Sequence, residues 1–368
     1  MRGRRPRATG TVGQGRPPGI HSLVRVAFLA VASLLTGCAG EDLPQDTLAP
    51  AGPVAQAQDE LWNIVFWVAL AVFVIVETLL IAVLVRFRAR PGDDSIPKQT
   101  HGNTRLEVIW TIIPALILAV IAVPTVQLIF ELSQPPEDAL EVRVIGKQYW
   151  WEFEYLGDEG KGVITANELV VPVGRPVRLT LESTGQATSD PLGVIHSFWV
   201  PKLAGKQDVV PGHQRHLSFT AEEEGTTYSG QCAEFCGLSH ANMRLAVLAV
   251  SEADFEEYLD SHSTASEPPS SGDEARGAQL FEERQCVGCH AVSGFEGAEA
   301  RIGPNLTFFA EREKFAGYML DNDINDSADN VRAWLKNPPQ VKPGSQMPNL
   351  GLSDQDINDL IIYLRTLQ

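Results

Sequence analysis

The sequence predicts a multi-domain protein with a two-helix transmembrane hairpin, an all-β sandwich or barrel, and an all-α C-terminal domain. Two long apolar runs lie within the first 130 of 368 residues. A stretch from 140 to 260 alternates apolar and polar residues between Gly and Pro, which is typical of half-buried antiparallel strands. The rest reads as short helices. The predicted parts are a signal peptide (1–37), a linker (38–58), the hairpin (59–131), the β domain (140–260), a second linker (261–273) and the C-terminal domain (274–368).

The chain carries a formal net charge of −17, which argues against nucleic-acid binding because that function needs a basic face. The first 37 residues hold six Arg and no acidic residue, so their removal would lower the charge by six, to −23. Such an acidic surface suits a basic protein partner that approaches by electrostatic steering.

The N-terminus has the order of a secretory signal: an Arg-rich segment, then an apolar run over 23–35. The next residues, Leu35-Thr36-Gly37-Cys38, resemble a bacterial lipobox, which implies that Cys38 is lipidated and begins the mature protein. An ordinary signal peptide with an unmodified cysteine is the alternative. Residues 39–58 are rich in Ala, Gly, Pro and Gln, which favours a flexible linker.

Two apolar runs, Leu61–Val85 and Val108–Phe130, are each long enough to cross a bilayer. The loop between them holds five Lys or Arg and three acidic residues, so the positive-inside rule places it in the cytoplasm. The export signal independently places the N-terminus outside, and everything after residue 130 is therefore expected on the exported side. Glu77 within the first run is either functional or paired with a polar group of a neighbouring subunit.

The segment Cys286-Val-Gly-Cys289-His290 is the attachment pattern of a c-type haem. Two thiols bond to one porphyrin edge, and the adjoining histidine turns under the iron. A zinc or redox Cys-x-x-Cys pair is the alternative. The predicted export, a preceding amphipathic helix over 275–284 and the carbonyl of Pro304, which could accept the His290 ring N–H, all favour haem.

Met347, in the loop Gly344–Pro348, is the predicted distal ligand of this haem. The chain has four methionines, of which Met243 belongs to another site and Met319 lies in a stretch that reads as helical. Met319 is the alternative ligand. A thioether opposite an imidazole favours Fe(II) and leaves no open position, so this haem is expected to carry electrons without binding oxygen.

A second group of metal donors occupies twelve residues from Cys232 to Met243, with a histidine 36 residues upstream. Two thiolates, two imidazoles, a thioether and a backbone carbonyl suit a soft, mixed-valence copper pair. A tetrahedral zinc site and a disulfide between the two cysteines are the alternatives. The predicted copper donors are His196, Cys232, Glu234 through its carbonyl, Cys236, His240 and Met243.

The pattern C-x-E-x-C-x3-H-x2-M, with the upstream His196-Ser-Phe-Trp-Val-Pro, resembles the dinuclear copper A domain of cytochrome c oxidase subunit II. The resemblance covers about residues 58–260, including the segment from Glu107 to Pro114, and implies a cupredoxin-like fold. The C-terminal part resembles class I cytochromes c. Together these parts are similar to the bacterial subtype in which subunit II carries its own cytochrome.

The resemblance implies roles for several further residues. The Glu234 carboxylate would reach a Mg or Mn ion at the boundary with subunit I. Glu107 would lie at the mouth of a proton channel of subunit I, although it could simply be a favourable acid at a helix N-terminus. The family accepts electrons from an external cytochrome c at an aromatic segment, which here reads Tyr149-Trp150-Trp151 with Tyr149 in place of the usual Trp; a tethered haem need not use the same residue.

The implied function is electron input to a proton-translocating terminal oxidase in the bacterial inner membrane. A periplasmic donor, such as a cytochrome c, reduces the haem; the electron passes to the copper pair and then to haem in subunit I, where oxygen becomes water. Subunits I and III are the implied partners, and the chain supplies no catalytic acid, base or nucleophile. The alternatives are a quinol oxidase subunit, which lacks the copper ligands, and a metal-storing or copper-delivery lipoprotein.

Overall fold

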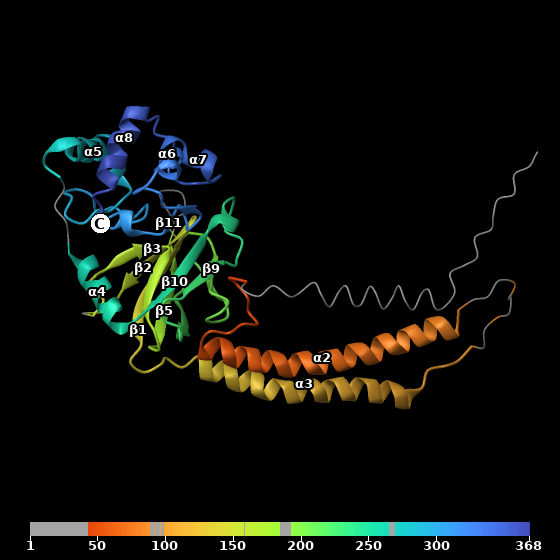
Figure 1. Cartoon of the computed structure of the whole chain (residues 1–368). Helices are drawn as coiled ribbons and strands as arrows, with labels where there is room; N and C mark the ends of the chain where they lie inside the picture. Colours follow the sequence, from red (N-terminus) through yellow and green to blue (C-terminus); the bar gives the residue numbers. More distant parts are fainter. Residues whose placement is uncertain are drawn as a thin grey trace, which may run out of the picture. The chain divides into compact units, whose positions relative to one another are not determined.

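The structure is a computed structural model that describes residues 43–88, 92, 96, 99–157, 159–184, 193–264 and 269–368. The predicted signal segment and Cys38 lie outside the described residues. Residues 44–368 cluster as one unit, which contains the two long helices, the β domain and the C-terminal helices (Figure 1).

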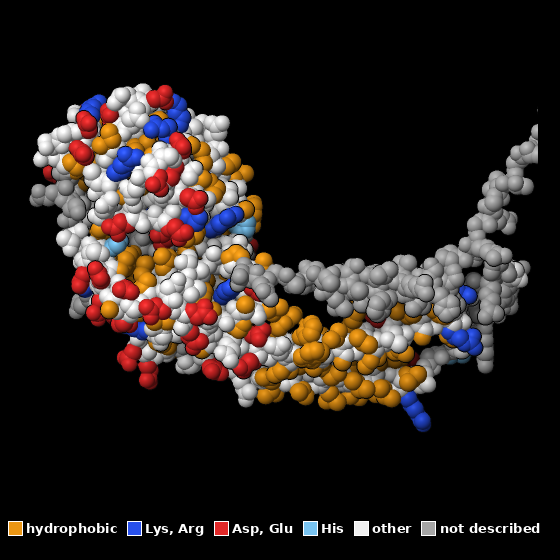
Figure 2. Space-filling view, in the orientation of Figure 1, with side chains coloured by type: hydrophobic (Ala, Val, Ile, Leu, Met, Phe, Trp, Pro, Cys, Tyr) orange, Lys and Arg blue, Asp and Glu red, His pale blue; other side chains and the backbone are white. Residues whose placement is uncertain are grey.

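Two long helices, α2 (Pro53–Arg86) and α3 (Thr104–Leu132), correspond to the predicted hairpin. Each is long and apolar enough to cross a membrane. Figure 2 shows apolar side chains along the exposed length of both helices, as a lipid-facing surface requires. Helix α3 continues through Pro114 and Pro124, which membrane helices tolerate.

Helix α2 begins inside the segment that the sequence predicted to be a linker. Pro53 occupies the first turn, where its missing N–H leaves no bond unmade. Just before it, the Ala51 N–H donates to the Lys202 carbonyl at 2.8 Å. Ala51 and Val54 pack against the core of the β domain. This tertiary packing extends the helix to residues 53–58, beyond the apolar run that the sequence shows.

The β domain (residues 140–250) is a sandwich of two five-stranded sheets, ordered β3-β2-β1-β5-β8 and β4-β10-β9-β6-β7 (Figure 1). Its core includes Trp151, Phe153 and Phe198, none of which is exposed. The strands are β1 (Leu140–Lys147), β2 (Trp150–Tyr155), β3 (Ile164–Ala166), β4 (Glu168–Pro172), β5 (Val177–Ser183), β6 (His196–Trp199), β7 (Gln207–Val209), β8 (Arg215–Phe219), β9 (Thr227–Cys232) and β10 (Arg244–Val250).

The sequence predicted antiparallel strands, which is wrong for two pairs. Strand β1 runs parallel to β5, and β4 runs parallel to β10. Strand β4 is buried at every position, as is usual for a parallel strand covered on both faces. Alternation along a strand identifies its buried face, but it carries no information about the direction of the neighbouring strand.

Helix α4 (Glu252–Ser263) follows the sandwich and shortens the predicted second linker. The Ser251 side chain accepts the Asp254 N–H at the helix start, a standard N-cap. Phe255 and Leu259 are buried in the core of the β domain. Only residues 264–271 separate α4 from the next helix, α5 (Gly272–Glu283).

The helical domain (residues 272–368) is built on α5 and α8 (Asp354–Leu364), which cross at Gly277. A Cβ at Gly277 would lie 2.2 Å from the Asp359 carbonyl oxygen, so the crossing requires glycine. Helix α8 buries the side chains that the sequence predicted to face inward: Ile357, Leu360, Ile361 and Leu364. The other elements are η2 (Cys286–Gly288), η3 (Phe309–Glu311), β11 (Lys314–Phe315), β12 (Leu320–Asp321), α6 (Asp329–Lys336) and α7 (Pro338–Val341).

Candidate functional site

The predicted copper donors lie where three strand ends of one sheet meet. His196 begins β6, Cys232 ends β9, and Met243 directly precedes β10. Strand β9 pairs with both β6 and β10, so these ends are adjacent. The Cys232 N–H donates to the Met243 carbonyl at 2.9 Å and closes the loop 233–242, which includes the turn η1 (His240–Asn242).

Cys232 lies at the centre of one half of the donor set. Its Sγ lies 3.8 Å from His196 Nδ1, 3.2 Å from the Glu234 carbonyl oxygen and 3.8 Å from Cys236 Sγ. The contact with the Cys236 sulfur lowers the pKa of Cys232 well below its ordinary value. The thiolate, which is the form that binds metals, is therefore favoured at Cys232.

Cys236 contacts the two remaining donors, His240 and Met243. Its Sγ lies 3.8 Å from His240 Nδ1 and 3.9 Å from Met243 Sδ. The contact with Cys232, together with burial, raises the pKa of Cys236. Both cysteines are free, because their sulfur atoms are much farther apart than the roughly 2.05 Å of a disulfide.

The donor chemistry fits a copper pair better than a single zinc ion. Two thiols face each other, and each also faces one imidazole and one weaker donor. A tetrahedral zinc site would use four of these groups and leave the thioether and the carbonyl without a role. Thiolate and thioether ligands are the ones that copper prefers.

The donor loop packs directly on the turn between β1 and β2. Gln148 Nε2 donates to the Cys236 carbonyl at 2.6 Å, and the Leu238 N–H donates to Tyr149 Oη at 3.1 Å. At Gly237, a Cβ would lie 2.3 Å from Tyr149 Oη, and φ is +128°. Only glycine fits at this position, because both the space and the backbone conformation exclude a side chain.

The aromatic residues of this turn are buried. Tyr149, Trp150 and Trp151 are 7%, 6% and 0% exposed. The Trp151 ring meets the His196 ring edge-on at 5.8 Å, while Tyr149 and Trp150 line a pocket of the helical domain. The three side chains therefore form no exposed surface at which an external donor could dock.

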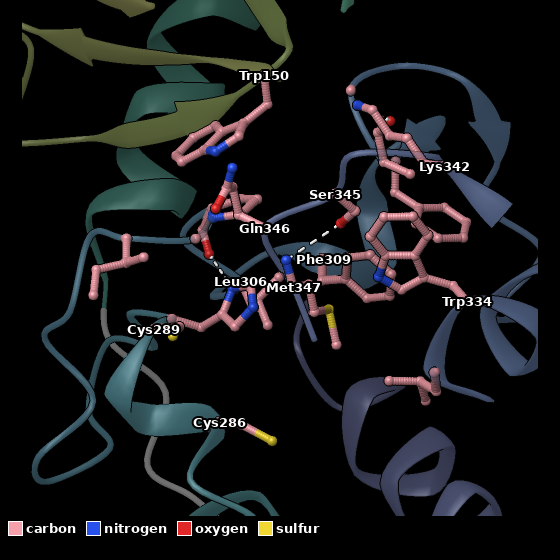
Figure 3. Close-up of a pocket in the computed structure, with 18 of the residues that line it drawn as sticks. Trp150, Cys286, Cys289, Leu306, Phe309, Trp334, Lys342, Ser345, Gln346 and Met347 are labelled. Carbon is pink, nitrogen blue, oxygen red and sulfur yellow. Dashed lines mark hydrogen bonds between the residues drawn. The ribbon is translucent and has the colours of Figure 1, made fainter. Parts of the chain in front are cut away.

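The pocket of the helical domain holds the predicted haem attachment residues (Figure 3). It is a cavity of about 380 Å³ lined by Cys286, Cys289 and His290. The Cys289 and His290 N–H groups both donate to the Cys286 carbonyl at 3.0 Å, which gathers the two thiols and the imidazole in one turn. Burial lowers the pKa of His290, which favours the neutral ring.

Gly303 and Pro304 contact the His290 ring and fix its orientation. His290 Nδ1 lies 2.7 Å from the Pro304 carbonyl oxygen, the partner that the sequence predicted. The ring N–H is thereby assigned to Nδ1, which leaves Nε2 free to bind a metal. At Gly303, a Cβ would lie 2.5 Å from His290 Cε1, so the chain can approach the ring only through glycine.

Met347 lines the same pocket, in the loop between α7 and α8 (Figure 3). Its N–H donates to Ser345 Oγ at 3.3 Å. Met319 does not line the pocket; it lies in the turn between β11 and β12, so its predicted helical setting is wrong. Positive φ angles at Gly317 and Tyr318 turn the chain there. A free cysteine pair, an oriented histidine and a thioether around an apolar cavity fit a haem c.

Four charged residues between the domains were not predicted from the sequence. Lys147 Nζ lies 2.8 Å from Glu152 Oε2, and both side chains are buried. Arg301 and Lys342 reach this region from the helical domain. Burial lowers the pKa of Lys342 to about 7. The available signal was Glu152 itself, since a buried charge between the aromatic residues of β2 needs a partner.

Of the remaining predicted residues, Glu107 and Glu77 lie in the two long helices, and the Glu234 carboxylate lies in the donor loop. Glu107 is in the first turn of α3 and is exposed, a position in which an acid stabilises a helix N-terminus. Glu77 lies half-buried in α2, and the Glu234 side chain lies half-buried in the donor loop.

Comparisons with known proteins agree with this organisation. The family model described as "Cytochrome C oxidase subunit II, transmembrane domain" matches residues 45–128. The models described as "Cytochrome C oxidase subunit II, periplasmic domain" and "Cytochrome c" match residues 158–250 and 274–368.

Similar proteins carry matching names. Cytochrome c oxidase subunit 2 of Alkalihalophilus pseudofirmus is 38% identical over 93% of this chain and 96% of its own length. Cytochrome c oxidase subunit 2 of Bacillus subtilis is 36% identical over 95% of this chain and 98% of its own length. Quinol oxidase subunit 2 of Bacillus spizizenii is 34% identical, over 65% of this chain and 72% of its own length. The chain therefore belongs to the cytochrome c oxidase subunit II family, in a form that carries a cytochrome c domain at its C-terminal end.

Proposed function

We propose that this chain is the electron-input subunit of a bacterial terminal oxidase. It accepts electrons from a periplasmic donor through a covalent haem c, passes them to a dinuclear copper A centre, and delivers them to subunit I for proton-coupled oxygen reduction. The observation that carries the proposal is the position of turn 148–150, which contacts the six-donor cluster on one side and lines the Cys-x-x-Cys-His pocket on the other. Haem and copper, when bound, supply one-electron carriers at these two places.

The chain would hold both groups in rigid settings. Cys286 and Cys289 would attach the haem covalently, with His290 oriented by Pro304 and with Met347 as the opposite ligand. The copper pair would be held by His196, Cys232, the Glu234 carbonyl, Cys236, His240 and Met243. The strand pairing around these donors limits their movement, which keeps geometric change between redox states small.

A short chain of contacts joins the two sites. Trp150 and Tyr149 line the haem pocket. Gln148, next to Tyr149, donates to the carbonyl of Cys236 at 2.6 Å. Gln148 also lines the pocket, so a single hydrogen bond connects a pocket-lining residue with a proposed copper ligand. This turn gives the electron a compact route between the centres.

The remaining roles follow from the membrane setting. Helices α2 and α3 would cross the bacterial inner membrane beside subunits I and III, with both soluble domains on the periplasmic side. Glu107 would lie at a proton-channel mouth, the Glu234 carboxylate would reach a Mg or Mn ion at the subunit I boundary, and Cys38 would carry a lipid. The net charge of −17 suits a basic donor.

A quinol oxidase subunit is the main competing function, because a protein of that name is 34% identical. A quinol oxidase subunit needs no copper donors and no attached haem. In this chain, six metal donors converge, three of them sulfur atoms, and a free cysteine pair lies beside an oriented histidine. These features favour the cytochrome c oxidase function.

Metal content, optical spectra and EPR of the full-length chain in its complex test this proposal. We expect one covalent haem c and two coppers that share one unpaired electron. Zinc, or a disulfide between Cys232 and Cys236, would overturn the copper assignment and leave a membrane-bound cytochrome with a different partner.

A further inference from the structure

Arg301 of the helical domain pairs with two carboxylates of the β domain, Glu152 and Glu154. Its Nη2 lies 2.5 Å from Glu152 Oε1 and 3.1 Å from Glu154 Oε2, and its Nε lies 3.2 Å from the same Glu152 oxygen. Glu152 is only 1% exposed. Two guanidinium N–H groups on one carboxylate give a charge-assisted, orientation-specific contact.

Lys147 completes this contact from the other side. Its Nζ donates to Glu152 Oε2 at 2.8 Å and to the Arg301 carbonyl oxygen at 2.5 Å. Lys147 is 5% exposed, and its ammonium also lies 4.7 Å from the centre of the Trp150 ring. The Glu152 carboxylate therefore receives one cation from each domain, and removing Arg301 would leave one of its oxygens without its partner.

Lys342 makes a second contact from a different loop of the helical domain. It is 3% exposed, and its Nζ donates to the Tyr149 carbonyl at 2.7 Å and to the Ala316 carbonyl at 2.8 Å. In the same loop, the Pro343 carbonyl accepts the Ser239 hydroxyl of the copper-donor loop. Separating the domains is costly, because it would leave the buried Lys342 amino group and the Tyr149 carbonyl without this hydrogen bond.

Two backbone N–H groups also donate hydrogen bonds between the domains. The Arg244 N–H donates to the Gly317 carbonyl at 2.9 Å, and the Lys314 N–H donates to Glu168 Oε1 at 3.0 Å. Both bonds cross from one domain to the other. They provide amide reporters of whether the domains stay together.

The positions of Arg301 and Lys342 connect this contact to the haem. Arg301 lies three residues before Pro304, whose carbonyl orients His290. Lys342 lies five residues before Met347 in the loop that lines the pocket. The segment that orients His290 and the loop that carries Met347 are therefore both attached to residues 147–152 of the β domain.

We propose that Arg301 and Lys342 clamp the haem-bearing domain onto residues 147–152 of the β domain. Electron transfer from haem to copper would then occur in a permanently docked state. The clamp rests on the proposed function for its role in electron transfer. The clamp makes Arg301 and Lys342 positioning residues. It also covers the aromatic residues Tyr149 and Trp150, so an external donor must deliver its electrons through the haem. A domain tethered only by residues 264–271 would instead swing and dock transiently.

Hydrogen exchange in the full oxidase complex tests the clamp without using activity. In the wild type, we expect the Arg244 and Lys314 amides to be as protected as strand amides of the β domain. In Arg301→Gln and Lys342→Met, exchange at these amides should accelerate about tenfold or more, since each variant loses charged hydrogen bonds. Arg301→Lys should restore part of the protection, and Arg276→Gln should change nothing, because Arg276 is exposed and pairs with Glu283 of its own helix, α5.

The internal electron-transfer rate, measured by rapid kinetics on the same samples, provides the functional test. We expect salt between about 0.01 and 1 M to leave the wild-type rate almost unchanged, because Glu152, which accepts the Arg301 contact, is buried and therefore weakly screened. Arg301→Gln should lower this rate about tenfold with unchanged haem and copper spectra. Fast wild-type exchange at the reporter amides, a salt-dependent rate, or an unaltered Arg301→Gln would each overturn the clamp. Absent haem or copper would instead overturn the proposed function, while the exchange result would still decide the clamp.

Discussion

The copper-donor cluster and the haem pocket are built in opposite ways. Five copper donors lie within twelve residues, the sixth lies on an adjacent strand, and strand pairing brings them together. The haem pocket is a cavity of about 380 Å³ whose walls come from distant segments, including η2, the loop near Gly303, helix α6 and the Met347 loop. The proposed copper site is thus largely formed by the fold, whereas the helical domain surrounds a space that the proposed haem would fill.

This difference teaches which site depends on its cofactor for structure. The β domain has its own continuous core of aromatic and aliphatic side chains. The core of the helical domain borders the pocket, and Phe309, Leu335 and Leu364 belong to both. Removing the copper should therefore cost little structure, whereas removing the haem should leave a large apolar void.

The largest effect is expected from replacing both haem-attaching thiols, Cys286→Ala with Cys289→Ala. Covalent haem should be lost completely, and the helical domain should lose its fixed packing because its core would border an empty cavity. The copper EPR signal should persist, since all of its donors lie in the β domain. Haem absorbance, circular dichroism and EPR measure the three parts. Loss of the copper signal in this variant would show that the two sites do not form independently.

Cys232→Ser should disrupt the proposed copper site and leave the haem pocket intact. The copper affinity should fall by more than about 100-fold, because even outer partners of metal ligands are worth 10- to 100-fold. The β domain should stay folded, since its core is complete without the metal, and haem absorbance should be unchanged. Copper analysis and thermal unfolding provide the measurements. An unfolded β domain would contradict the view that the copper site is formed by the fold.

Met347→Leu sharpens the assignment within the haem pocket. Loss of the thioether should lower the reduction potential and open one axial position to small ligands such as carbon monoxide. The matched control is Met319→Leu, which changes the same residue type outside the pocket. Redox titration and carbon monoxide difference spectra distinguish the two variants. A potential shift in the control with none in Met347→Leu would assign the ligand to Met319.

The smallest effect is expected at His262, in the last turn of α4. Its ring lies between the Tyr258 and Phe308 rings, each 4.0 Å away, and Nε2 lies 3.6 Å from Glu311. Burial lowers the pKa of His262 to about 4, from an ordinary value near 6.5. Between these values the unfolded chain binds the proton and the folded chain does not, so stability falls as pH drops from 6.5 to 4.

His262→Gln removes this titration and tests it. The wild type should lose about 1–3 kcal/mol more unfolding free energy than the variant between pH 7 and pH 4. Thermal unfolding of the complex at several pH values measures the difference. Parallel pH curves for the two proteins would show that His262 does not contribute.

Much of the organisation was predictable because its signals are local in the chain. The hairpin followed from apolar length, and the inward face of α8 followed from the spacing of Ile357, Leu360, Ile361 and Leu364, all of which are buried. The expected partner of His290 was a carbonyl fourteen residues away, and the structure has this contact. The lengths of the two linkers were predicted less well, because packing against the β-domain core extends α2 and α4 beyond their sequence signals.

The sequence by itself predicted the proposed donor sets, because copper and haem ligands are recognised by residue type and close spacing. Only the tertiary structure decided how the two domains meet. Lys147 and Glu152 are far in the chain from Arg301 and Lys342. The parallel direction of two strand pairs also could not be predicted from the alternation of apolar and polar residues. The physical reason is that pairing of charges and strands over long separations depends on which surfaces folding brings together, which no local pattern encodes.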